Sequence, residues 1–170
     1  MTKHLKWWEL IGILICIGLG TLLHFVYQWS GNNPLVGLIA PVNESTWEHL
    51  KLLLFPILFY SILEYMSIGQ YYGNFLFAKY LGVVCGMLSI VGLFYGYKAI
   101  VGHHSLGIDI LIFIISILIA YIISCYLILY QPKWNMPPTV ILSFLMITIL
   151  LFWLFTWLPP NIFLFHVPKR

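Results

Sequence analysis

Charged residues are scarce in this sequence of 170 residues: Asp, Glu, Lys and Arg together make up 8% of it, with eight basic and five acidic side chains. Soluble proteins carry about 25% charged and roughly 45–50% apolar residues, whereas 62% of this chain is apolar and its mean hydropathy is +0.98. The interior of one soluble domain could not bury that much apolar surface. The composition predicts an integral membrane protein whose main partner is the lipid bilayer.

Basic runs and cysteine motifs are also lacking. The net charge of +3 is spread along the chain, so the surface that nucleic acid would require is missing and no nucleic-acid partner is expected. The three cysteines, Cys16, Cys85 and Cys125, stand far apart inside apolar runs. They predict small buried side chains and not a disulfide framework or a CxxC metal site.

Long apolar runs are what the sequence has in place of charge. A helix needs about 20 residues to cross roughly 30 Å of hydrocarbon and must satisfy its own backbone hydrogen bonds there. Five runs meet this length, at residues 7–29, 46–68, 75–100, 105–130 and 139–158. We predict an all-α bundle of five transmembrane helices forming a single transmembrane domain over residues 1–170. Lys3 and Lys6 precede the first run as in a signal peptide, but no small-x-small cleavage pattern follows, so we expect an uncut span.

Three features of the spans and loops bear on packing. Residues 34–41 are apolar but too short to cross a bilayer, which predicts a re-entrant or interfacial segment, or one that packs on the bundle. The third span carries glycines four residues apart, at positions 82, 86, 92 and 96, a spacing that lets helix backbones approach closely. Pro56 interrupts the hydrogen bonds of the second span and predicts a kink.

Loop charge does not decide the orientation of the chain. With the amino terminus inside, four basic residues lie on each side: Lys3, Lys6, Lys79 and Lys133 inside, and Lys51, Lys98, Lys169 and Arg170 outside. Because the first helix usually dominates and only Lys3 and Lys6 flank it closely, we expect a cytoplasmic amino terminus and a carboxyl terminus outside.

Polar residues concentrate between residues 41 and 51, read Pro-Val-Asn-Glu-Ser-Thr-Trp-Glu-His-Leu-Lys. Ser45 and Glu48 have the spacing of a capping box at a helix start. That interpretation leaves His49 and Lys51 unexplained where the helix enters the membrane, unless Lys51 extends to the interface or pairs with Glu48. An odd number of spans places this loop, the third loop and the carboxyl-terminal tail on one side. The ligand-binding candidates gathered there are Glu44, Glu48, His49, Lys51, His103, His104 and Asp109.

A divalent metal such as zinc is one possible ligand of that side. Glu44 and Glu48, four residues apart, would share a helical face, and His104 and Asp109 would join them from the third loop, which makes these four the candidate metal ligands. The pattern is not diagnostic, because no His-Glu-x-x-His is present and His103 and His104 cannot both face one centre from a regular helix. Asp109 is alternatively a helix cap or a partner of Lys51 or Lys98.

Glu64 and Lys79 form a second polar pair, each about four residues from the same end of its span. Opposite charges at similar depth offset each other's desolvation, so a structural ion pair between helices is expected. A proton or ion path is the functional alternative.

The string at residues 41–51 resembles a family of small prokaryotic multi-pass membrane proteins known only as a domain of unknown function. The resemblance extends through Trp29-Ser30-Gly31 and Val36-Gly37 to Gly102-His103-His104-Ser105-Leu106 and Ile108-Asp109-Ile110. It implies a multi-pass bundle in a prokaryotic plasma membrane, and no activity.

Three function classes follow from these observations. The first is a membrane protein that binds a small molecule, lipid or metal through the polar residues at one membrane face. The second is a metal-dependent hydrolase or lipid-modifying enzyme, with Glu48 or His49 as base and His104 and Asp109 as metal ligands or orienting groups. The third is an accessory protein or a small transporter. Binding is favoured over catalysis because no nucleophile and base pair can be identified.

Overall fold

The computed structural model describes residues 2–103 and 105–167, and those residues form helices and loops with no strand. The long helices are α1 (Thr2–Trp29), α3 (Lys51–Ser67), α4 (Phe75–Val101), α5 (Leu106–Tyr130) and α6 (Pro138–Trp157). Short α2 (Thr46–His49) continues into α3, and single turns of 3-10 helix stand at η1 (Val36–Leu38), η2 (Gly69–Tyr71) and η3 (Phe163–Phe165). The predicted all-α fold is confirmed, and five helical stretches, counting α2 with α3, are long and apolar enough to cross a membrane.

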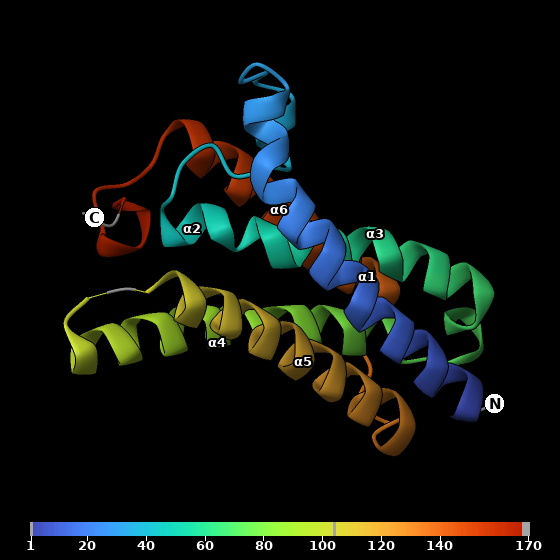
Figure 1. The fold of residues 1–170 in the computed structure, drawn as a ribbon. Helices are drawn as coiled ribbons and strands as arrows, with labels where there is room; N and C mark the ends of the chain where they lie inside the picture. The colour runs from blue at the N-terminus through green and yellow to red at the C-terminus, as the bar shows by residue number, and fades with distance from the viewer. Residues whose placement is uncertain (1, 104, 168–170) are drawn as a thin grey trace.

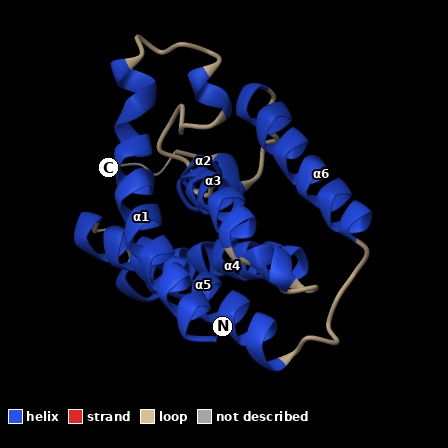
Figure 2. Ribbon diagram, turned by 90° about the vertical axis from the view of Figure 1, so that its right-hand side faces the viewer, coloured by secondary structure: helices blue, strands red, loops and turns tan. Residues whose placement is uncertain are grey.

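Helices α4 and α5 run antiparallel beside each other (Figure 1). Helix α1 packs on α3 and α5, and α6 packs on α4 and on η1. Seen from the side, α1 and α6 lie on opposite flanks of α3 (Figure 2). Most of their outward side chains are apolar, as in Leu14 and Leu150, which is the surface that lipid requires.

Glycines explain why α4 and α5 lie so close. A Cβ atom at Gly82 would stand 2.5 Å from the Ala120 carbonyl oxygen, and one at Gly86 would stand 3.0 Å from both Ala120 Cβ and the Ser116 carbonyl oxygen. At Gly92 and Gly96 nothing lies within 4 Å of such an atom. The close approach predicted from the glycine spacing is therefore made by the first pair only.

Helices α1 and α3 also meet at a glycine. Pro56 lies inside α3 and has no amide hydrogen, so the carbonyl of Leu52 loses its usual helical donor. A Cβ at Gly20 of α1 would lie 2.5 Å from that carbonyl oxygen. Gly20 thus allows α1 to cross α3 where Pro56 has left a backbone acceptor without its helical partner.

The loop between α1 and α2 packs on the bundle, one of the arrangements expected from its short apolar segment. It turns at Gly31 and Asn32, which have φ values of 69° and 60°. Its η1 turn packs against α6 and α1, and a Cβ at Gly37 would meet Val42 at 2.8 Å and Tyr27 at 3.2 Å. The loop is thereby held over one end of the bundle.

We call this the motif end. It holds residues 30–50, the α4–α5 connection and η3, while the opposite end holds the start of α1, η2 and the α5–α6 connection (Figure 1). Contacts tie the motif end together: the Tyr95 hydroxyl lies 3.1 Å from Thr46 Oγ1 and donates to the Phe163 carbonyl, and Trp47 packs on the rings of Phe152 and Phe165. The first loop, third loop and tail fall together as predicted.

Candidate functional site

Helix α2 begins with half of the predicted capping box. Ser45 Oγ accepts from the Glu48 backbone amide at 3.4 Å, but Glu48 does not return the contact. The Ser45 amide instead donates to Asn43 Oδ1 at 2.9 Å. The Asn43 side chain therefore takes the role expected of Glu48, and the Glu48 carboxylate is available for other partners.

The prediction that Glu44 and Glu48 share one helical face is wrong. Glu44 precedes the N-cap Ser45, so it lies in the loop and the helical spacing does not apply. The Glu44 side chain is 50% exposed, whereas that of Glu48 is 2% exposed. The two carboxylates occupy different sites.

Glu48 and Lys51 form the centre of a buried polar network. Lys51 Nζ donates to Glu48 Oε2 at 2.8 Å, to Thr156 Oγ1 at 2.7 Å and to the Gly37 carbonyl at 2.8 Å. Glu48 Oε2 also accepts from the Val42 amide at 2.9 Å, and Thr156 Oγ1 lies 3.0 Å from Glu48 Oε1. The network joins α2 and the start of α3 to the first loop and to α6. The Lys51 side chain is fully buried.

Of the alternatives left open for Lys51, pairing with Glu48 is the one observed. Its ammonium and the Glu48 carboxylate are occupied by protein groups, so this pair contributes packing and charge balance. Thr156 was not identified from the sequence, because it lies 105 residues from Lys51 and a lone threonine in an apolar span carries no signal.

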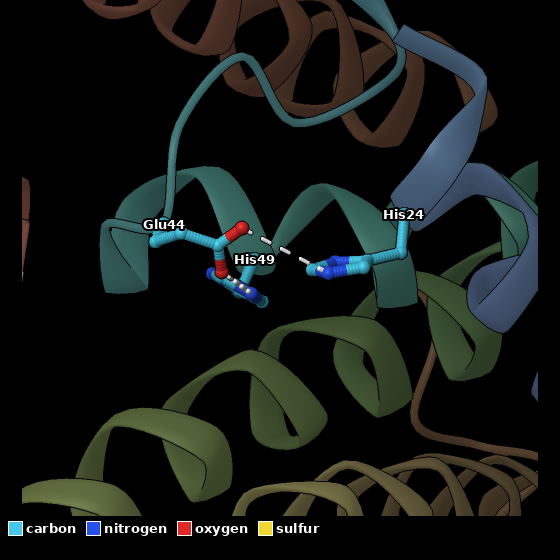
Figure 3. A group of neighbouring side chains, drawn as sticks. All are labelled: His24, Glu44 and His49. Atoms are coloured by element: carbon cyan, nitrogen blue, oxygen red, sulfur yellow. Dashed lines mark ion pairs between the residues drawn. The ribbon is translucent and has the colours of Figure 1, made fainter. Parts of the chain in front are cut away.

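A second group, His24, Glu44 and His49, lies at the edge of the motif end (Figure 3). Glu44 belongs to the loop that precedes α2, and its carboxylate lies between His24 of α1 and His49 of α2. Its Oε2 is 3.4 Å from His49 Nε2, and its Oε1 is 3.9 Å from His24 Nε2. The imidazole centroids are 5.3 Å apart, and the histidine side chains are 31% and 30% exposed.

The backbone fixes the tautomer of His49. Its Nδ1 lies 2.8 Å from the Ser45 carbonyl oxygen, which can only accept, so Nδ1 carries the proton. The lone pair of the neutral ring is then on Nε2, the atom that faces Glu44. Metal-binding histidines commonly have this arrangement, with one ring nitrogen donating to a backbone carbonyl and the other free to coordinate.

A small cavity of about 40 Å³ adjoins this group. It is lined by His24, Glu44 and by Tyr27, Gln28, Pro41, Val42 and Asn43. Its size suits about one water molecule, and its lining is largely polar.

The third loop supplies a separate polar contact. The Tyr97 hydroxyl donates to Asp109 Oδ1 at 2.7 Å and accepts from the Ser105 amide at 2.9 Å. The contact joins the end of α4 to the start of α5. Neither Lys51 nor Lys98 takes Asp109 as an ion-pair partner in the described part of the chain: Lys51 pairs with Glu48, and Lys98 Nζ lies 5.9 Å from the Phe94 ring centroid.

The predicted site residues are thus distributed over several places. His103 is exposed in the third loop, and His104 lies outside the described residues. Among the described residues, Glu44 is the one predicted metal ligand that lies in a group of metal-binding atoms, and His49, predicted as a ligand-binding residue or base, joins it. His24 is not among the residues predicted from the sequence, because a single histidine near a span end has no local motif.

At the opposite end, Lys79 pairs with Glu64 as predicted, with Nζ 2.7 Å from Glu64 Oε2. A second carboxylate was missed: Glu9 of α1 accepts from the same ammonium at 2.8 Å. All three side chains are buried.

Comparison with known proteins places the chain in a family but assigns it no activity. No curated protein and no solved structure matches it. A family model, described as a family of unknown function (DUF6512), matches residues 1–168. The expected resemblance to an uncharacterised family is confirmed, and the chain belongs to the DUF6512 family.

Proposed function

We propose that this protein binds a divalent metal ion at the motif end of its helical bundle, through His24, Glu44 and His49. The observation that carries the proposal is the orientation of His49, whose Nε2 lone pair is directed at Glu44 while Nδ1 donates to the Ser45 carbonyl. A cation is needed between Nε2 and the carboxylate oxygen at 3.4 Å, either a metal ion or a second proton on His49, and His24 adds a nitrogen that a metal ion would use.

The ligand set favours a zinc-like ion over calcium or magnesium. Two imidazoles and one carboxylate match the donors that zinc takes, whereas calcium and magnesium prefer oxygen ligands throughout. Atoms bound tetrahedrally at about 2.0–2.1 Å lie roughly 3.3 Å apart. The 3.4 Å separation already fits, and the remaining ligand atoms, all within 4.8 Å of one another, need only to turn inward.

Metal binding gives the direct test of the proposal. Protein purified without chelator, stripped and then titrated with Zn²⁺ in detergent should bind one ion per chain. We expect His49→Ala to weaken the affinity by at least about 100-fold, because loss even of outer partners of metal ligands costs about 10–100-fold. Isothermal titration and elemental analysis measure both quantities.

His166→Ala is the matched control, since His166 is another exposed histidine at the motif end and bonds Asn161 outside the group. It should leave the affinity unchanged. A wild-type protein that takes up no Zn²⁺, Co²⁺ or Mn²⁺, or an affinity that His49→Ala leaves intact, would refute the proposal.

Hydrolysis is the second candidate function, supported by the openness of the group. Three protein ligands leave a coordination position for water, as in catalytic zinc sites, and the polar cavity lies beside it. Glu48 is not a suitable base, because its carboxylate is buried against Lys51. We expect the zinc-loaded protein to cleave a lipid ester and the metal-free protein to be inactive. Equal product from both forms in an ester hydrolysis assay would exclude this reaction.

A further inference from the structure

The buried Glu9–Lys79–Glu64 cluster, which we call the triad, carries more acid than base. Two carboxylates of α1 and α3 lie 2.8 Å and 2.7 Å from one ammonium of α4. With all three groups ionised, the triad has a net charge of −1 inside the bundle. Each group is at most 7% exposed.

The other groups around the triad do not supply the missing positive charge. The titratable ones are Tyr60 of α3, Tyr121 and Cys125 of α5, and Cys16 of α1. Phenols and thiols are neutral near pH 7 because their ordinary pKa values are about 10 and about 8.5. Lys6 stands one turn before Glu9 on α1, but its side chain is exposed on the outside of the bundle.

The two carboxylates have unequal surroundings. Glu9 accepts from Lys79 and lies 3.2 Å and 3.3 Å from the donating Ser124 hydroxyl. Glu64 is fully buried and lies at ion-pair distance from Lys79, yet neither of its oxygens accepts a hydrogen bond of directional geometry from the described residues. Burial of an ionised carboxylate without hydrogen bonds is costly, so Glu64 is the weaker of the two as an anion.

Among the described residues, Lys79 is the one ammonium that lies beside the two acids. Its ammonium also lies 4.6 Å from the centroid of the Tyr121 ring and 5.5 Å from that of Phe75, and neither ring carries a formal charge. One carboxylate neutralises it. The second carboxylate then costs less free energy when it is protonated than when it is charged.

We propose that the triad is a proton-binding site in which Glu64 takes up one proton from water to become a neutral carboxylic acid, while Glu9 and Lys79 stay ionised. Uptake forms one O–H bond on Glu64 and changes the charge of the triad from −1 to zero. The site is independent of the metal group. Glu64 stands thirteen positions after Lys51 on α3, about 20 Å at about 1.5 Å per residue.

Infrared spectroscopy tests this directly, because a protonated carboxyl has a C=O stretch that a carboxylate lacks. The full chain is reconstituted in phosphatidylcholine nanodiscs and measured near pH 7, with isotope-labelled glutamate to assign the band. We expect a carboxylic acid band in the wild type. It should be absent from Glu64→Gln, and also from Glu9→Gln, because removal of either acid leaves one carboxylate for one ammonium.

Glu44→Gln, which changes a half-exposed acid at the motif end, is the control and should keep the band. The proposal is overturned if the wild type has no carboxylic acid band near neutral pH, a result that needs no variant to fold. It is equally overturned if the band persists in Glu64→Gln, which would place the proton elsewhere, or in Glu9→Gln, which would show that surplus charge is not its cause.

Discussion

Replacing Glu48 with alanine is expected to lower the free energy of unfolding by about 3–5 kcal/mol, the range measured when one partner of a buried ion pair is removed. The Lys51 ammonium would remain fully buried with neutral acceptors only, and the Val42 amide would lose its partner. The same change would remove one of the two bonds by which Thr156 of α6 is joined to the pair. Thermal or denaturant unfolding of the purified protein measures the effect.

Two further variants separate the charge pair from the motif as a whole. In metal-free protein, Glu44→Ala, in the same motif but half exposed, should change the unfolding free energy by no more than about 0.5 kcal/mol. Glu48→Gln combined with Lys51→Met removes both charges, and should cost less than the sum of the two single changes. An unaltered unfolding midpoint for Glu48→Ala would contradict the structural role assigned to this network.

The effect of Glu48→Ala on stability also bears on the choice between function classes. The accessory hypothesis requires that Glu48 hold the loops together, and the Glu48 network does join the first loop to α6. The His24, Glu44 and His49 group depends on that loop for its carboxylate. A stable loop is therefore a condition for the proposed metal binding, and a structural role of Glu48 is compatible with that proposal.

The fold could be predicted from the sequence because its signals are local. Each span needs only its own run of apolar residues, and the observed helices begin and end within a few residues of the predicted ranges, except that α1 starts earlier, at Thr2. The grouping of loops at one end followed from the number of spans alone. Close packing at Gly82 followed from glycine spacing, although the sequence did not distinguish Gly82 and Gly86 from Gly92 and Gly96.

The candidate site was harder to predict because its contacts join residues far apart in the sequence, or depend on the exact residue at which a helix begins. Glu44 lies one residue before the N-cap, and that single position moves its carboxylate from the Glu48 face to the two histidines. His24 and Thr156 meet the motif through the packing of α1 and α6, which no sequence spacing encodes. Glu9 likewise reaches Lys79 across 70 residues. The orientation of the chain in the membrane stays a prediction.

Close packing of α4 on α5 makes Gly82 the second position where a small change should have a large effect. A Cβ there would stand 2.5 Å from the Ala120 carbonyl oxygen, a backbone atom that cannot move without moving α5. We expect Gly82→Ala to lower the free energy of unfolding by about 1–3 kcal/mol, as overpacking does, and Gly82→Val to lower it further.

Gly92→Ala provides the matched control on the same helix, because nothing lies within 4 Å of a Cβ at that position. Alanine forms helix more readily than glycine, so this variant should be neutral or stabilised by up to about 1 kcal/mol. The unfolding midpoints of the two alanine variants are measured in the same detergent. Their difference separates the effect of the nearby α5 backbone from the effect of helix propensity. Equal midpoints for Gly82→Ala and Gly92→Ala would mean that α4 and α5 are not held together at this contact. A lower midpoint for Gly82→Ala alone would place the α4–α5 contact at Gly82, one helical turn from Lys79 of the triad.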